Sequence, residues 1–261
     1  MPLLGRPDSA LEPLARTAPP LAAPLKNELR FRVFDVVATI LILPFALVLS
    51  SMIALAVLAD SPGPVLYRCR RVGYRGELFE MVKFRKMRRD AVGSALTAYE
   101  DERFTPIGKF LSVTRLDELP QLWNVLKCDM RLVGPRPEIE EFVSHYPHEY
   151  EEILSVRPGL TGMAQLEFFD ESRVFGEAHS HPRFYSEGIL PHKIELDLQY
   201  VRNRSLRADI AIFLRTPVLP LRVAARKLAV VVAAQPRGHL VTYVGVALCA
   251  LLLLVTFSTQ T

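Results

Sequence analysis

Cysteine is scarce in this 261-residue sequence, and several common enzyme motifs are missing from it. The three cysteines, Cys69, Cys128 and Cys249, lie far apart without CxxC spacing, which supports neither a disulfide framework nor a cysteine zinc site and favours a reducing, cytosolic setting. The absence of GxGxxG, P-loop and GxSxG patterns argues against a Rossmann cofactor, Walker-type nucleotide binding and a serine hydrolase. Nucleic-acid-binding motifs are also absent, so we expect no nucleic-acid partner.

The sequence is hydrophobic despite many charges. Lys and Arg number 32 against 28 Asp and Glu, which gives a net charge of +4, yet 50% of the residues are hydrophobic and the mean hydropathy is +0.18. A positive mean hydropathy is unusual at 23% charged residues and points toward lipid. The basic excess suits nucleic acid, anionic lipid or a phosphorylated substrate, so charge alone does not choose among these partners.

The N-terminal part predicts a tail followed by a membrane segment. Residues 1–30 are rich in proline at their start and predict a flexible tail, whereas residues 31–60 are apolar and long enough for the ~20 residues that cross a bilayer. Pro44 interrupts this apolar run, and basic residues lie on both of its flanks, so the positive-inside rule gives no orientation. A re-entrant helix that bends near Pro44 and leaves on the same face explains both features. The alternative is an ordinary span with a proline kink.

The C-terminal part predicts a second membrane contact. Residues 217–236 are apolar but contain several basic side chains, which suits a segment lying in the headgroup region. Residues 240–257 carry no charge and are just long enough to form a transmembrane helix, with the basic residues before them placing its start on the cytoplasmic side. The alternative for residues 240–257 is a buried core helix.

Between these segments, residues 61–216 predict a domain that lies in the cytosol. Two alternating runs flank Gly73 and Gly76 and indicate a β-hairpin. Apolar spacing predicts helical pieces within residues 104–127 and an amphipathic helix over residues 194–216. We therefore expect an α+β fold, mainly helical and membrane-associated, with one small hairpin.

Two adjacent carboxylates, Asp117 and Glu118, stand just before Pro120, where a helix is expected to begin. A helix start favours anions, including phosphate. Neighbouring carboxylates can divide the labour of phosphoryl transfer, one attacking phosphorus and the other holding Mg²⁺. The alternative is a solvated helix start with ordinary surface acids.

Several basic side chains have the surroundings expected of phosphate ligands. Arg136 lies in the rigid turn GPRP, and Arg157 lies in the similar turn RPGLTG. Guanidinium groups held this way suit two-pronged binding of phosphate oxygens. KFRKM adds Lys83 and Arg85 at the end of the second expected strand. The alternative is that these prolines and glycines serve only the backbone of turns.

The ordered set of motifs resembles one family, the monotopic phosphoglycosyl transferases, also called bacterial sugar transferases. The resemblance covers most of the chain, and five blocks in order are far more specific than any single block. They are RVFDVVATILILP (32–44), DSPGPVLYRCRRVGYRGELFEMVKFRKM (60–87), DERFTPIGKFLSVTRLDELPQLWNVLKCDMRLVGPRPE (101–138), RPGLTGMAQ (157–165) and DLQYVRNRSLRADIAIFLRT (197–216).

The resemblance implies transfer of a sugar 1-phosphate from a UDP-sugar to a polyprenyl phosphate, with release of UMP, at the cytoplasmic face of the bacterial inner membrane. By the same resemblance, Asp117 is the nucleophile that forms a covalent phosphosugar intermediate, Glu118 helps to bind Mg²⁺, and Pro44 bends the re-entrant helix. Arg115 and Arg136 match positions around the active-site phosphates, and Lys83 and Arg85 match the KFR block near the site. The resemblance thus makes residues 61–216 the catalytic domain.

The sequence departs from the family pattern in three places. Leu43 stands where a serine often precedes the helix-bending proline, and Lys86 replaces the threonine of KFRTM. Residues 166–169, LEFF, replace a polar, glycine-containing stretch, which leaves the sugar open. Two other functions are kept as alternatives, a non-enzymatic membrane scaffold and a nucleotide-sugar or lipid pyrophosphate hydrolase. A homo-oligomer is compatible with the sequence, which does not fix the oligomeric state.

Overall fold

The computed structural model describes residues 25–91, 93, 96–97, 101–169 and 182–219. The chain divides into two units, Met1–Phe213 and Leu214–Thr261, and all packing described below lies within the first. The segments 217–236 and 240–257, for which membrane contacts are predicted, lie outside the described residues except for 217–219. Their predicted roles stay predictions.

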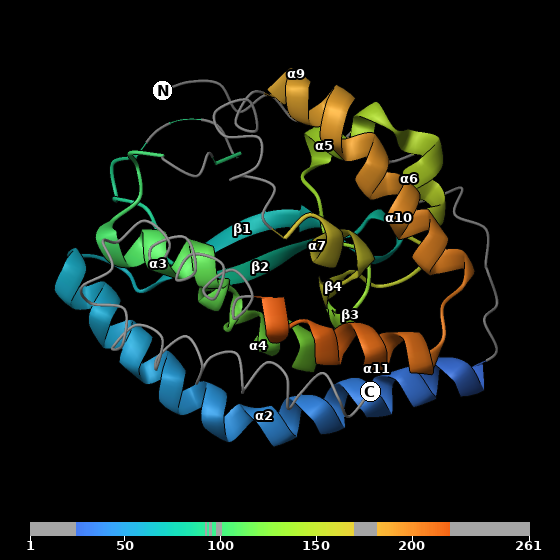
Figure 1. The fold of residues 1–261 in the computed structure, drawn as a ribbon, viewed down its shortest axis with the longest axis horizontal. Helices are drawn as coiled ribbons and strands as arrows, with labels where there is room; N and C mark the ends of the chain where they lie inside the picture. Colours follow the sequence, from blue (N-terminus) through green and yellow to red (C-terminus); the bar gives the residue numbers. More distant parts are fainter. Residues whose placement is uncertain (1–24, 92, 94–95, 98–100, 170–181, 220–261) are drawn as a thin grey trace, which may run out of the picture. The chain divides into compact units, whose positions relative to one another are not determined.

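Helices dominate the described part, together with two small sheets (Figure 1). This agrees with the predicted α+β, mainly helical class. In chain order the elements are α2 (Leu25–Asp60), β1 (Leu66–Val72), η1 (Tyr74–Gly76), β2 (Leu78–Phe84), α3 (Pro106–Thr114), η2 (Leu116–Glu118), α4 (Gln121–Leu126), β3 (Arg131–Val133), α5 (Glu140–His145), α6 (Pro147–Ile153), β4 (Gly159–Thr161), α7 (Met163–Glu167), α9 (Pro182–Phe184), η4 (Tyr185–Ile189), α10 (Leu190–Arg202) and α11 (Leu206–Arg215).

The apolar N-terminal segment is one continuous helix, α2, which contains Pro44 and curves along its length (Figure 1). It begins at Leu25, inside the segment predicted as a tail, because residues 25–30 lack the prolines that disfavour a helix in the preceding residues. Pro44 removes one backbone donor without ending the helix, so the break that proline can also cause does not occur there. By length and composition, Glu28–Asp60 is apolar enough to cross a membrane.

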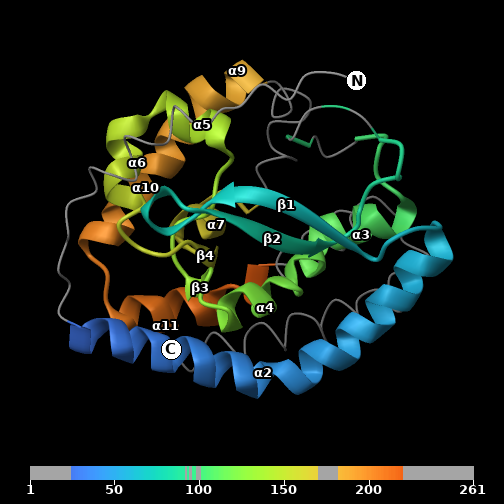
Figure 2. The same cartoon turned by 180° about the vertical axis from the view of Figure 1, so that it is seen from behind.

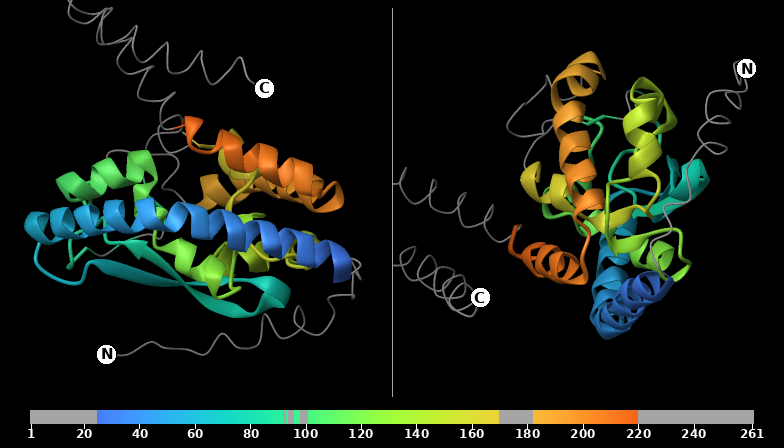
Figure 3. Two further views of the ribbon diagram at one scale, coloured as in Figure 1. Left: turned by 90° about the horizontal axis from the view of Figure 1, so that it is seen from below. Right: turned by 90° about the vertical axis from the view of Figure 1, so that its right-hand side faces the viewer.

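Helix α2 has two unlike faces. Its inner face packs on the rest of the unit along the whole helix, from Phe31 and Asp35 near the start to Ile53 and Val57 near the end. Its outer face is exposed yet apolar, and Phe45, next to the proline, is 79% exposed. Seen from below, α2 runs between the hairpin on one side and α3 and α11 on the other (Figure 3).

Polar contacts attach the first half of α2 to the body of the unit. Asp35 lies in the apolar run, yet it is buried and receives a hydrogen bond from Arg131 Nε at 2.9 Å. Arg131 Nη2 donates to Asp209 Oδ2, also at 2.9 Å, so one guanidinium bridges carboxylates on α2 and α11. Tyr200 donates a further hydrogen bond of 2.7 Å to Asp209. Asp35 therefore serves to dock the helix.

The predicted hairpin is confirmed. Strands β1 and β2 pair antiparallel from Leu66 opposite Phe84 to Val72 opposite Leu78. The turn between them contains Arg75 at φ 56° and Gly76 at φ 79°, both in the left-handed region that tight turns use. Figure 2 shows the hairpin lying beside α2, α3 and α4.

A second, parallel pair of strands was not predicted. Residues Arg131–Val133 and Gly159–Thr161 are too short to show a period, and they meet only because Gly134 and Gly159 let the two backbones approach. A side chain at Gly159 would overlap the backbone of Gly134. The single amphipathic helix predicted for residues 194–216 is wrong, because the segment forms α10 and α11 with a break after Arg202. The polar run RNRSLR had already marked this interruption.

Candidate active site

The two adjacent carboxylates lie in η2, a single turn between α3 and α4. Helix α3 begins at Pro106 after Thr105, whose hydroxyl accepts a hydrogen bond from the Gly108 N–H at 3.0 Å. It ends at Thr114, and the left-handed conformation of the next residue, Arg115 (φ 60°), turns the chain sharply. This turn directs both carboxylates into the unit, where each is buried.

Asp117 is buried without a hydrogen bond. Asp117 is 1% exposed, and neither of its carboxylate oxygens has a hydrogen-bonding partner among the residues that the structure describes. Its nearest charge is Lys86, with Nζ 3.6 Å from Oδ2. Lys86 is held in place because Gly108 of α3 packs directly against its backbone. A buried acid that serves only the structure usually has its oxygens hydrogen-bonded, so the unused lone pairs of Asp117 mark it as a candidate functional group.

Glu118 has the opposite surroundings. Its Oε1 receives Arg136 Nη2 at 2.6 Å and Lys83 Nζ at 3.0 Å, and Arg115 Nη1 lies 3.9 Å away. Burial alone raises the pKa of Glu118, but Arg136, Lys83 and Arg115 outweigh it and hold the pKa well below the usual 4.5. Glu118 is therefore ionised at neutral pH and gathers three cations next to Asp117.

Lys83 is affected in the opposite direction. Burial lowers its pKa from 10.5 to about 8, although the carboxylate of Glu118 favours the charged form. Strand β2 holds Lys83 on the face turned toward η2. The ammonium group therefore carries its charge at neutral pH and loses it as the pH rises through about 8.

Arg136 is positioned by the loop that follows β3. Gly134 donates its N–H to Thr161 at 2.9 Å, and Pro135 accepts from the Gly159 N–H at 2.8 Å, which ties the loop to β4. The two predicted turns, GPRP and RPGLTG, are thus hydrogen-bonded to each other. The pairing of the two turns sends the Arg136 side chain to Glu118.

A buried polar cluster lies beneath that loop. Asp197 of α10 accepts the backbone N–H of Arg136, and burial together with the negative charge of Glu138 raises the pKa of Asp197 to about 8. Glu138 accepts a hydrogen bond of 2.7 Å from Tyr185 and pairs with Arg71 at 3.7 Å. Helix α10 therefore fixes the backbone from which Arg136 extends.

The structure brings Lys83, Arg115 and Arg136 together with Asp117 and Glu118, but not the other two predicted phosphate ligands. Arg85 donates to the carbonyl oxygens of Ser61 at 2.5 Å and Pro62 at 3.0 Å and to that of Val57 at 3.4 Å, so it binds the end of α2. Arg157 donates to the Cys128 carbonyl at 3.0 Å and stacks on Tyr74.

Comparisons with known proteins identify the family to which this chain belongs. The sequence model of the family described as "Bacterial sugar transferase" matches residues 26–222, which is more than half of the chain. The chain belongs to the bacterial sugar transferase family. The match includes all of α2 after its first residue, both carboxylates and all three cations around Glu118.

Curated relatives of this bacterial sugar transferase agree in their names. The "UDP-glucose:undecaprenyl-phosphate glucose-1-phosphate transferase" of Caulobacter vibrioides is 38% identical over 194 residues, which cover 72% of this chain and 68% of the relative. The Xanthomonas campestris pv. campestris protein of the same name is 40% identical over 68% of this chain and 35% of its own length. The "Undecaprenyl-phosphate galactose phosphotransferase" of Salmonella typhimurium is 35% identical over 76% of this chain and 42% of its own length. The chain therefore spans about two thirds of the first and less than half of the other two.

Sequence reasoning missed three residues of this sugar transferase's site. Lys86 belongs to a predicted basic motif but had no assigned role, although its ammonium group forms the ion pair with Asp117. Gln121 is 1% exposed, and its Nε2 lacks a partner within the described part of the chain. Its position one helical turn after Asp117 is a signal that the sequence did contain. Asp197 gave no signal, because its contact with the Arg136 backbone depends on the tertiary fold.

The donor atoms of the site fit a magnesium ion that is shared with phosphate. In the described residues, no three carboxylate, histidine or cysteine side chains gather into a metal cage. Mg²⁺, however, commonly uses one or two carboxylates plus substrate phosphates. Asp117 has free lone pairs, and Glu118 Oε2 meets only Arg136 Nη1 at 3.4 Å among the hydrogen bonds found for it. The cations around Glu118 Oε1 would repel a Mg²⁺ ion that arrives without phosphate.

Replacing Arg85 with methionine is expected to lower stability rather than donor affinity. The substitution removes its hydrogen bonds to the end of α2, each of which contributes about 1.5–3 kcal/mol when the donor is charged. We expect the free energy of unfolding, measured by denaturant titration, to fall by about this amount, with an unchanged KM for the sugar donor. Arg136→Lys is the matched control and should raise that KM. A raised KM in the Arg85 variant would return Arg85 to the phosphate site.

Proposed function

We propose that this sugar transferase moves a sugar 1-phosphate from a UDP-sugar to undecaprenyl phosphate and releases UMP, which starts the assembly of a surface glycan. The observation that carries the proposal is Asp117, a buried carboxylate with no hydrogen bond from the described residues, placed beside a cluster of four cations. The names of the relatives support the acceptor and the reaction class. The sugar and the pathway are left open by this support.

The reaction proceeds by two displacements at one phosphorus. In the first, an Asp117 oxygen bonds to the phosphorus that bears the sugar, and the bond from that phosphorus to the bridging oxygen breaks, so UMP leaves with the electron pair. In the second, a phosphate oxygen of the lipid bonds to the same phosphorus and Asp117 leaves as a carboxylate. Because the nucleotide departs before the lipid enters, one set of cations serves both steps.

The charged side chains of the site have different parts in the proposal. Arg136 and Arg115 hold the phosphate oxygens with their planar donors, and Lys86 stabilises Asp117 as an anion. Glu118 keeps Lys83 and Arg136 in place and is the protein ligand proposed for Mg²⁺. When bound, Mg²⁺ would neutralise charge on the phosphate oxygens.

The packing of α2 supports a re-entrant rather than a crossing helix. Residues near both ends of α2, Asp35 and Val57, are buried against the same unit, whereas an ordinary span would place its ends on opposite sides of the bilayer. The exposed apolar outer face would lie in the membrane, with the bend at Pro44 deepest. Withdrawing a lipid tail costs ~0.8 kcal/mol per CH₂, so an acceptor held by its tail needs a site at headgroup height. We place the catalytic unit at the cytoplasmic face of the bacterial inner membrane.

Cysteine labelling tests this placement. In a background without native cysteines, single cysteines at Lys26, before the apolar run, and at Asp90, after it, are expected to react from the same side. The measurement is reaction with a membrane-impermeant maleimide in right-side-out and inverted membrane vesicles, with both positions labelled only in the inverted ones. Labelling from opposite sides would mean that α2 crosses the membrane.

The pH profile tests the part played by Lys83. Below its pKa of about 8 the ammonium is present beside Glu118, and above it the charge is lost. We therefore expect UMP release to fall as the pH rises through about 8, while Glu118 stays ionised throughout the neutral range. Lys83→Arg keeps its charge and should move the decline to higher pH. The same alkaline decline in both proteins would assign it to another group.

The direct test of the proposed reaction is UMP release by the purified protein from a panel of nucleotide sugars, with Mg²⁺ and with or without polyprenyl phosphate. A transferase forms the lipid-linked sugar, and it releases UMP over repeated turnovers only when the lipid is present. Equal turnover without the lipid would indicate a hydrolase. No turnover with any sugar nucleotide would favour a scaffold.

A further inference from the structure

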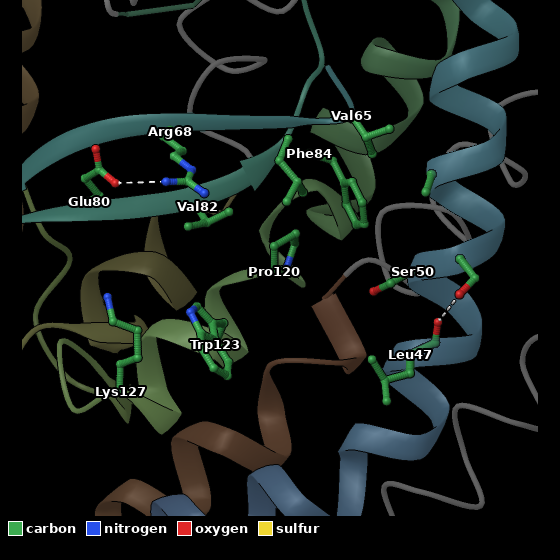
Figure 4. A pocket seen from close by; sticks show the side chains of 13 residues that line it. Leu47, Ser50, Val65, Arg68, Glu80, Val82, Phe84, Pro120, Trp123 and Lys127 are labelled. Carbon is green, nitrogen blue, oxygen red and sulfur yellow. Dashed lines mark hydrogen bonds and ion pairs between the residues drawn. The ribbon is translucent and has the colours of Figure 1, made fainter. Parts of the chain in front are cut away.

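A groove lies between three elements on the hairpin side of the unit (Figure 4). Its volume is about 580 Å³, which is in the range of pockets that enclose small organic ligands. Helix α2, the hairpin and α4 each supply part of the wall. The residues that line the groove are Leu47, Ser50, Ser51, Ala54, Val65, Leu66, Arg68, Glu80, Val82, Phe84, Pro120, Trp123 and Lys127.

The groove and the reactive carboxylates lie on opposite faces of the hairpin. Successive side chains of a strand alternate between its two faces. Val82 and Phe84 line the groove, so Lys83 between them points to the other face, where it meets Glu118. A chain lying in the groove would therefore be separated from Asp117 by strand β2. This separation argues against the groove as the place of the reacting lipid.

The groove continues the apolar outer face of α2. Leu47 lines it and is 58% exposed, and Val48, Met52 and Leu55 of the same helix are exposed beside it. On the opposite wall Trp123 of α4 is 61% exposed, although large aromatic side chains usually gain from burial. If α2 lies in the membrane, the groove opens to lipid along this wall.

The far end of the groove is charged. Figure 4 shows Arg68, Glu80 and Lys127 at the end away from Leu47 and Ser50 of α2. Arg68 pairs with Glu80 at 3.4 Å across the exposed face of the hairpin, a weak contact, and Arg70 lies opposite Glu80 in the strand register. Lys127 pairs with Asp129 Oδ2 at 2.9 Å, so three cations (Arg68, Arg70 and Lys127) face two acids, and this end keeps a net positive charge. An apolar channel that ends in excess positive charge complements a molecule with a hydrocarbon chain and an anionic head.

We propose that this groove binds a bilayer phospholipid with an anionic headgroup, as a site separate from that of the lipid substrate. One acyl chain lies between α2 and Trp123, and the headgroup phosphate meets Arg68 and Lys127. The bound lipid would hold the hairpin and α4 at a constant height above the membrane. The proposal depends on the membrane contact of α2 and not on the chemistry of Asp117.

Trp123 provides the measurement, because it is the only tryptophan in the chain. The full-length protein is reconstituted in vesicles of phosphatidylglycerol and phosphatidylcholine of constant composition, in which one or the other lipid carries brominated acyl chains. Bromine quenches tryptophan fluorescence on contact. We expect stronger quenching when phosphatidylglycerol carries the bromine, because the groove selects the anionic lipid over its random share.

Variants assign the effect to the groove. Ser50→Phe fills it and is expected to reduce quenching, whereas Met52→Phe on the same turn of α2 points away and should leave quenching unchanged. Arg68→Ser with Lys127→Ser should abolish the preference for brominated phosphatidylglycerol, since each cation near a bilayer changes the affinity for an anionic lipid about fivefold. Circular dichroism checks that each variant is folded.

Two outcomes would overturn the proposal. Equal quenching by the two brominated lipids in the native protein would show that Trp123 merely touches the membrane. Displacement of the brominated lipid by small amounts of polyprenyl phosphate would show that the groove holds the substrate instead. Because fluorescence needs no turnover, neither outcome depends on whether the proposed reaction is correct.

Discussion

Replacing Asp117 with asparagine is expected to abolish the formation of the lipid-linked sugar. The amide has nearly the same shape as the carboxylate, but it cannot form the bond to phosphorus that carries the first displacement. Loss of a nucleophile typically lowers kcat about 10⁴-fold or more, so we expect no UMP release above background in a single-turnover assay. Normal UMP release by the variant would remove Asp117 from the reaction.

Stability provides the control for that variant. Asp117 is buried but receives no hydrogen bond from the residues that the structure describes, so its charge costs free energy without compensation. We therefore expect Asp117→Asn to be at least as stable as the native protein in thermal unfolding. Glu102→Gln, at an exposed acid of the same domain, should leave both stability and activity unchanged.

Replacing Arg131 with methionine is expected to cause the largest loss of stability. Its guanidinium bridges the buried carboxylates of Asp35 and Asp209, and its removal takes away the ion pair of both, leaving them the hydrogen bonds from the Leu132 N–H and the Tyr200 hydroxyl. Breaking a buried ion pair from one side typically costs about 3–5 kcal/mol, measured here as the free energy of unfolding in denaturant. We also expect faster proteolysis of α2, because these contacts attach its first half to the unit.

A compensating variant separates the ion network from simple packing. Asp35→Asn and Asp209→Asn remove the stranded charges, so adding both to Arg131→Met should recover much of the lost stability. If Arg131→Met costs less than about 1 kcal/mol, the usual range for an exposed pair, the network does not dock α2. No recovery in the triple variant would instead point to the packing of Arg131 on Phe31.

Local patterns predicted much of the fold. The hairpin follows from alternation around Gly73 and Gly76, and α2 follows from an apolar run of bilayer length. The parallel pair β3 and β4 could not be predicted, because two strands of three residues show no period and meet through contacts distant in sequence. The break between α10 and α11 was visible as a polar run, but the apolar spacing on its two sides favoured one helix.

The site was predicted to a similar extent. The carboxylate pair and the two proline-flanked or glycine-flanked arginine turns stood out in the sequence, and the fold brings Arg136 to Glu118. Arg85 has the same basic motif as Lys83 but lies two residues further along, where the strand has ended and its side chain reaches α2. Composition cannot distinguish an arginine that binds phosphate from one that binds carbonyl oxygens. Only tertiary contacts make that distinction.

The central claim is that Asp117 carries the sugar phosphate between donor and acceptor. The most direct measurement is mass spectrometry of the intact protein, and then of its peptides, after rapid mixing with the sugar nucleotide and Mg²⁺ in the absence of polyprenyl phosphate. We expect a mass increase equal to one phosphosugar, located on Asp117, that disappears when the lipid is added. Product formation with no adduct on Asp117 at any time would contradict the account.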